Sequence, residues 1–104
     1  MDEAKIYMNY KQAVQQADRL QDQAEQLRRI ADNRMGDLMQ RVNANWRGES
    51  ADAYLAKCAA MQEKVDRTAR SLTNTANALR QAAQRTYNAE LRALEIARQR
   101  TYEG

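Results

Sequence analysis

The sequence predicts an all-α protein, a long antiparallel helix-turn-helix hairpin that dimerises into a four-helix bundle. Strong helix formers such as Ala, Gln, Arg, Glu and Leu dominate the chain, which has no Phe and no Pro. Apolar residues recur every three or four positions along both halves of the chain, and Asn and Gly interrupt them at mid-chain. At 104 residues, the chain is expected to form a single domain, 1–104, with a thin core.

The first predicted helix covers about residues 3–43. Its apolar residues alternate in steps of four and three until a second step of four, from Ala31 to Met35, shifts the register. Gly36 offers a rival break, but the apolar stripe continues past it, and a glycine inside a helix costs only about 1 kcal/mol. The stripe residues that we expect to pack in the hairpin or the dimer are Tyr10, Leu20, Leu27 and Leu38.

The second predicted helix covers about residues 50–99 and is followed by a frayed C-terminal tail. Its apolar stripe keeps strict three-four spacing from Ala51 to Ile96, the pattern of a long amphipathic helix. Its expected packing residues are Tyr54, Met61, Leu72 and Leu79.

A turn is predicted between the helices, at about residues 44–49. Asn45 is a poor helix-interior residue, and Gly48 can take the positive φ that a chain reversal needs. Ser50 can cap the helix that follows. The only tryptophan, Trp46, can cover the exposed end of the apolar seam.

A lone hairpin of this kind would leave apolar residues in water. Two helices bury one narrow stripe each, and the stripes here are wide and rich in Ala and Thr. The flanking residues left exposed would be Ile30, Met39, Leu55 and Leu94. Packing two hairpins into a four-helix bundle would bury them, so we expect an oligomer, most simply a dimer.

Composition argues against several functions. One cysteine, Cys58, and no histidine leave no intramolecular disulfide and no plausible metal site. No carboxylate pair, activated nucleophile or phosphate loop indicates an enzyme, and no cofactor is expected. The net charge of +3 comes from interspersed charges, which does not favour nucleic-acid binding.

Membrane insertion is not expected, because no apolar run approaches the length of a transmembrane helix. The first residues, MDEAKIYMNYKQ, lack the hydrophobic stretch of a cleavable signal peptide. Any export is therefore expected to bypass the general secretory route, from a cytoplasmic starting point.

The mid-chain motif resembles that of a known family. Trp46 and Gly48 are followed by Ser50, Ala51 and the aromatic Tyr54, which gives W-x-G-x-S-A-x-x-aromatic between two uninterrupted helical patterns. In length, composition and motif position, residues 1–100 are similar to the WXG family of early-secreted-antigen-like (Esx) proteins, which type VII secretion systems export.

The resemblance implies a small secreted substrate or escort protein, without enzymatic activity. It implies a homodimer, or a heterodimer with another WXG-type protein or a larger secreted helical toxin. It also implies that Trp46 and Gly48 form a turn that the membrane ATPase of the system recognises during export.

Many members carry Y-x-x-x-D/E near the C-terminal end of the second helix, and this chain departs from that pattern. Tyr87 is followed by Glu90 one residue too early, and Tyr102 has only Glu103 and Gly104 after it. These four residues, Tyr87, Glu90, Tyr102 and Glu103, are the candidate C-terminal signal. Either the chain carries its own signal there or its partner supplies one.

Two other functions remain open from the residues alone. A structural coiled-coil subunit of another complex would share the periodicity but would have no reason for the mid-chain motif. A weakly basic nucleic-acid-binding hairpin would need its arginines on one exposed face and would bind DNA in a salt-sensitive way.

Overall fold

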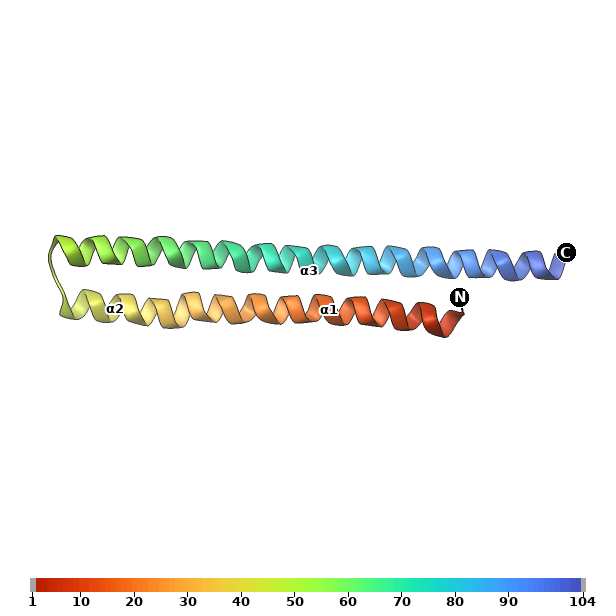
Figure 1. Cartoon of the computed structure of the whole chain (residues 1–104), viewed down its shortest axis with the longest axis horizontal. Coiled ribbons are helices and arrows are strands. Elements are labelled where there is room, and N and C mark those ends of the chain that lie inside the picture. Colours follow the sequence, from red (N-terminus) through yellow and green to blue (C-terminus); the bar gives the residue numbers. More distant parts are fainter. Residues whose placement is uncertain (1, 104) are drawn as a thin grey trace. The chain divides into compact units, whose positions relative to one another are not determined.

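The computed structural model describes residues 2–103, and the side chains of residues 2–101. Every element in this range is helical: α1 (Glu3–Arg29), the π-helix η1 (Ile30–Met35), α2 (Gly36–Asn45) and α3 (Glu49–Glu103) (Figure 1). The start of α1 is capped by Asp2, whose Oδ1 accepts a hydrogen bond from the Lys5 backbone N–H at 2.8 Å. The predicted all-α hairpin class is confirmed.

The chain divides into two compact units, each of which pairs two helical segments. The terminal unit consists of Met1–Leu20 and Asn74–Gly104, and the turn unit consists of Gln21–Thr73. In the terminal unit, Tyr10 bonds to Gln84 and Asp18 bonds to Arg80, so the two segments run antiparallel. In the turn unit, the segments are joined by the short connection between α2 and α3 (Figure 1).

The buried core is made almost entirely of alanine. Side chains with nearly no exposed surface are Ile6, Ala17, Ala24, Ala31, Ala51, Ala69 and Ala76. The regular seven-residue spacing of many of these alanines keeps them on one helix face, and their small size lets paired helices approach closely. Because each alanine buries a single methyl group, at about 0.8 kcal/mol per carbon, each unit has little apolar stabilisation.

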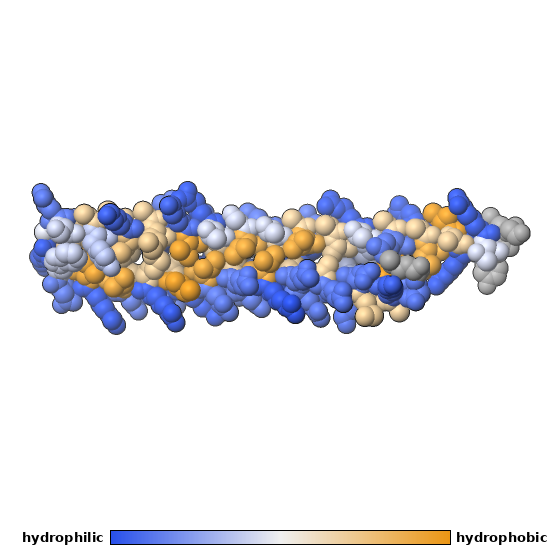
Figure 2. All heavy atoms as spheres, viewed as in Figure 1, coloured by the Kyte–Doolittle hydropathy of each residue, from blue (hydrophilic) through white to orange (hydrophobic). Residues whose placement is uncertain are grey.

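The larger residues that were predicted to pack divide into two groups. Tyr10, Leu20, Leu27 and Leu72 are half-buried. The other group, Leu38, Tyr54, Met61 and Leu79, is exposed, by 37% to 59% of the residue surface. Figure 2 shows hydrophobic residues reaching the surface between hydrophilic ones. The chain by itself therefore buries its alanines and leaves several of its largest apolar side chains in solvent.

The first predicted helix contains a π-helical segment that the sequence reasoning did not foresee. It covers Ile30–Met35, where two successive steps of four shift the apolar stripe. A π-turn holds more residues than an α-turn, so it can absorb the extra residue. After it, Met35 and Val42 of the stripe are half-buried, whereas Leu38 is exposed. The Gln62 side chain binds the segment, because its Nε2 donates to the Ala31 carbonyl at 2.7 Å.

The second predicted helix corresponds to α3, which extends further at its C-terminal end than the predicted residue 99. α3 continues to Glu103, through the region where the sequence suggested a frayed tail. None of the helices within residues 2–103 has the length and apolar character required to cross a bilayer.

Candidate functional site

The turn between α2 and α3 presents the tryptophan. Trp46 follows the last residue of α2 and has an extended backbone, with φ −137° and ψ 129°. Its N–H donates to the Val42 carbonyl at 2.9 Å, which is the last backbone hydrogen bond of α2. Trp46 is therefore the C-terminal cap of this helix. The neighbouring Asn45 side chain donates to the Arg41 carbonyl at 2.9 Å and satisfies another carbonyl of the last turn.

Gly48 makes the reversal possible. Its φ of +117° is a backbone conformation that residues with a side chain rarely adopt. A Cβ at this position would meet no other atom within 4 Å, so the conformation alone explains the glycine. The Gly48 carbonyl then accepts the Asp52 N–H at 3.0 Å, which is the first hydrogen bond of α3.

The structure places the start of the second helix earlier than the predicted Ser50 cap. α3 begins at Glu49, so Ser50 already lies in its first turn and Gly48 takes the flanking position. Gly48 is the flanking residue because its carbonyl accepts the hydrogen bond from the Asp52 N–H. Glu49 and Asp52 in the first turn place negative charge near the helix N-terminus, where the helix dipole favours it.

The Trp46 indole rests on Tyr54 and remains accessible. The two ring centroids are 5.9 Å apart, with planes inclined at 47°. Trp46 keeps 46% and Tyr54 keeps 40% of its surface exposed. Contact with Tyr54 restricts the indole, and the exposed part offers an apolar surface with an N–H donor, a combination enriched at protein interfaces.

The structure describes the side chains of two candidate C-terminal signal residues, Tyr87 and Glu90, both in the terminal unit. Tyr87 packs against Tyr10 and Tyr7, with ring centroids 4.8 Å and 6.2 Å away. Tyr87 and Glu90 line the same hollow between α1 and α3. The side chains of Tyr102 and Glu103, the other two candidates, lie outside the described residues.

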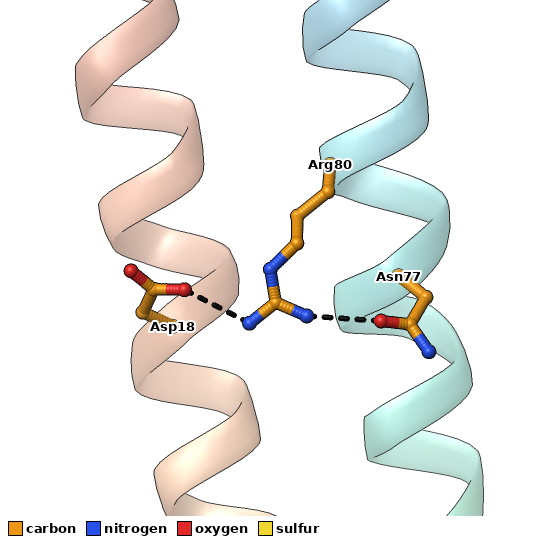
Figure 3. Close-up of polar contacts among 3 residues, drawn as sticks. All are labelled: Asp18, Asn77 and Arg80. Atoms are coloured by element: carbon orange, nitrogen blue, oxygen red, sulfur yellow. Dashed lines mark hydrogen bonds and ion pairs between the residues drawn. The ribbon is translucent and has the colours of Figure 1, made fainter.

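A surface ion pair also links α1 and α3 in the terminal unit. Arg80 Nη2 donates to Asp18 Oδ1 at 2.8 Å, and Arg80 Nη1 donates to Asn77 Oδ1 at 2.9 Å (Figure 3). The Asn77 side chain thus holds the guanidinium in position for Asp18. The Asp18 side chain is 60% exposed, so solvent screens the pair and its contribution is about 0–1 kcal/mol.

The structure brings some predicted site residues together and reveals contacts that the sequence reasoning missed. Trp46 meets Tyr54, and Tyr87 shares a hollow with Glu90. The tyrosine cluster of the terminal unit was missed, although the positions of Tyr7 and Tyr10 on or beside the apolar stripe were a signal for it.

The two parts of the candidate site present aromatic and apolar surface with few charged groups. Across the part of the chain that the structure describes, no three His, Cys, Asp or Glu side chains converge on a possible metal position. The turn offers a backbone reversal with an accessible aromatic pair. The terminal unit offers an apolar hollow with a carboxylate.

Comparison with known protein families identifies a match over most of the chain. The family model described as "Proteins of 100 residues with WXG" (WXG100) matches residues 5–90, which include the turn and most of the helical residues on either side of it. No curated protein and no solved structure matches the chain significantly.

Proposed function

Because the chain belongs to the WXG100 family, the small secreted proteins of type VII secretion systems, we propose that it is an export substrate or escort whose turn is read by the secretion machinery. It acts in this role by binding other proteins and not by catalysis. The proposed reader of the turn is the membrane ATPase of the system.

The observation that carries this proposal is the solvent exposure of the Trp46 side chain. A tryptophan needed only to plug the end of a hairpin would be buried, whereas this indole keeps 46% of its surface in solvent. The extended backbone at Trp46 and the positive φ of Gly48 hold it at the reversal, and Tyr54 supports it. Aromatic side chains held in this way are frequent anchors of protein interfaces.

The same proposal includes a helical partner. WXG100 proteins pair with other WXG proteins in type VII systems. In this chain, Leu38, Met61 and Leu79 lie outside the alanine core and are exposed to solvent. A helical partner would bury these side chains. The proposed assembly is a four-helix bundle with an identical chain, a sibling WXG protein or the helical region of a larger secreted toxin.

Export of a Trp46→Ala variant tests the role of the turn. In a cell that carries the type VII system, we expect the amount of the variant in the medium to fall by roughly tenfold or more, the effect of losing an aromatic anchor. The measurement is the ratio of secreted to intracellular protein. Circular dichroism and light scattering of the purified variant should show unchanged helix content and pairing.

The matched control is Arg47→Ala, which alters the adjacent residue of the same turn and leaves the indole in place. Its export should equal that of the unaltered chain. Full export of Trp46→Ala would refute recognition through the indole. A stable folded monomer of 12.0 kDa, with every candidate partner present, would refute the pairing.

A further inference from the structure

A long apolar groove lies between α1 and α3 in the terminal unit. It consists of two hollows, of about 220 Å³ and about 430 Å³, that share Ile6 and Glu90. The first hollow reaches Leu79 and the second reaches Ala97, so the groove follows α3 for about 27 Å at 1.5 Å per residue. We call it the Glu90 groove. Its length fits an extended occupant better than a small molecule.

The wall of the Glu90 groove suits a helix. The residues that α3 contributes to it include Ala82, Ala83, Ala93 and Ala97. The distance between packed helix axes depends on the side chains at the contact, and small side chains such as alanine permit a close approach. A third helix can therefore lie in the groove without displacing α1 or α3.

Glu90 is an unusual residue to find in this apolar wall. Its Oε2 atom is sealed from solvent and has no hydrogen-bond partner among the described residues. The arginines that pair in this unit are committed elsewhere, Arg80 to Asp18 and Arg98 to Glu3. A carboxylate oxygen removed from water without a partner is costly, and a charged donor is what offsets that cost best.

A basic side chain satisfies both features of the groove. The methylene stem of Lys or Arg packs on apolar walls while its charged end reaches a polar group. A metal ion fits less well, because no cluster of three potential ligands exists within residues 2–101. A water molecule would need two to four polar partners. The second hollow does not supply them, because Glu90 is the one polar residue in its lining, whereas the first hollow also has Asn9, Thr86 and two tyrosines.

We propose that the Glu90 groove binds a helix of a partner protein that inserts one Lys or Arg side chain, surrounded by small apolar residues, to pair with Glu90. This inference rests on the proposed function in one respect, that the partner is a helical protein. It adds that the partner helix carries a Lys or Arg among small apolar residues, and that Glu90 of this chain recognises this basic residue.

Synthetic helices test the proposal. Three alanine-rich peptides of about 20 residues, long enough to form a helix, differ only in a central Arg, Met or Glu. Each is titrated into isotope-labelled full-length chain while the methyl signals of Ile6, Leu79 and Leu94 are followed by NMR. The Arg peptide should shift these signals and bind roughly tenfold tighter than the Met peptide, with the Glu peptide weakest.

The Glu90→Gln variant identifies the group responsible. It keeps the shape of the side chain and should abolish the preference for Arg over Met. The matched control is Glu95→Gln, which removes the same charge from an exposed position on the same helix and should keep the preference. Circular dichroism establishes that both variants are folded.

Several results would overturn the proposal: equal affinity for the Arg and Met peptides, a preference that survives Glu90→Gln, or no shift of the Ile6 signal with any peptide. The last result would also follow if a second copy of this chain fills the groove. If the peptides show no preference while light scattering still finds a paired chain, the groove assignment fails and the proposed function stands. If the chain pairs with no helical partner, the proposed function fails whatever the peptides show.

Discussion

The terminal unit and the turn unit both pair two helical segments around buried alanines, but different interactions hold the segments together. Ala17 and Ala76 are buried in the terminal unit, as Ala24 and Ala69 are in the turn unit. The terminal unit adds a cluster of three tyrosines and ion pairs between its segments. The turn unit adds one hydrogen bond from Gln62 to a backbone carbonyl, and its segments are joined by the turn itself.

The two units also differ in the length of chain between their paired residues. Tyr10 and Gln84 are 74 positions apart, whereas Gln62 and Ala31 are 31 apart and Trp46 and Tyr54 only eight. Closing the longer loop costs about 0.8 kcal/mol more entropy, which the side-chain contacts near the chain ends can offset. Aromatic rings supply such contacts with the largest buried area per residue.

The largest expected effect comes from the tyrosine cluster. Tyr87→Ala removes the ring that touches both Tyr7 and Tyr10 and should lower the free energy of unfolding by about 2 kcal/mol. Tyr87→Phe keeps the ring and should lose little. Hydrogen exchange should show protection lost mainly in residues 3–20 and 74–101. Equal loss in residues 21–73 would mean that the two units unfold as one, which would remove the contrast between them.

The turn should be the next most sensitive point. Gly48→Ala forces a side chain into a φ of +117° and should destabilise the chain by about 1–2 kcal/mol. Gly36→Ala is the matched control, since its Cβ also meets no atom within 4 Å but its backbone is helical. It should stabilise by about 0.5–1 kcal/mol. Thermal unfolding measures both, and opposite signs are expected; two changes of the same sign would contradict the assigned backbone conformations.

The smallest expected effect is at the π-helix. Gln62→Ala removes the hydrogen bond to the Ala31 carbonyl and should cost about 1 kcal/mol. Gln81→Ala, at an exposed position of the same helix, should be close to neutral. Urea unfolding of the two variants gives the difference. If they were equally stable, the turn unit would be held by its alanines and its turn alone.

The elements that sequence reasoning predicted are the ones that local spacing governs. The period of the apolar residues identified the helices, because residues three and four apart share a helix face. Gly48 marked the turn because few residues tolerate its positive φ. Asn45 marked it as a poor helix-interior residue, and it is the last residue of α2. The step from Ala31 to Met35 marked the site of the π-helix, but a register shift by itself does not say which kind of helix absorbs it.

The candidate site was predictable only in part. The motif around Trp46 was visible because its members are neighbours in the sequence. The spacing of Tyr87 and Glu90 was visible too, but their surroundings were not. That Tyr87 meets Tyr10, and that Glu90 Oε2 has no partner among the described residues, depends on which residues of α1 lie opposite α3. The periodicity of either helix leaves this alignment open, since a shift of one turn would preserve both stripes.

By itself, the sequence determined that this chain is helical and where it reverses, because both follow from residues close together along the chain. It also determined the family, through a match that runs along residues 5–90. Tertiary structure alone decided that alanines form the core, that Leu38 and Met61 stay exposed, and that Glu90 lies in an apolar groove. The physical reason is that burial depends on the side chains across the helix interface, and small residues there draw the helices together and leave larger ones outside.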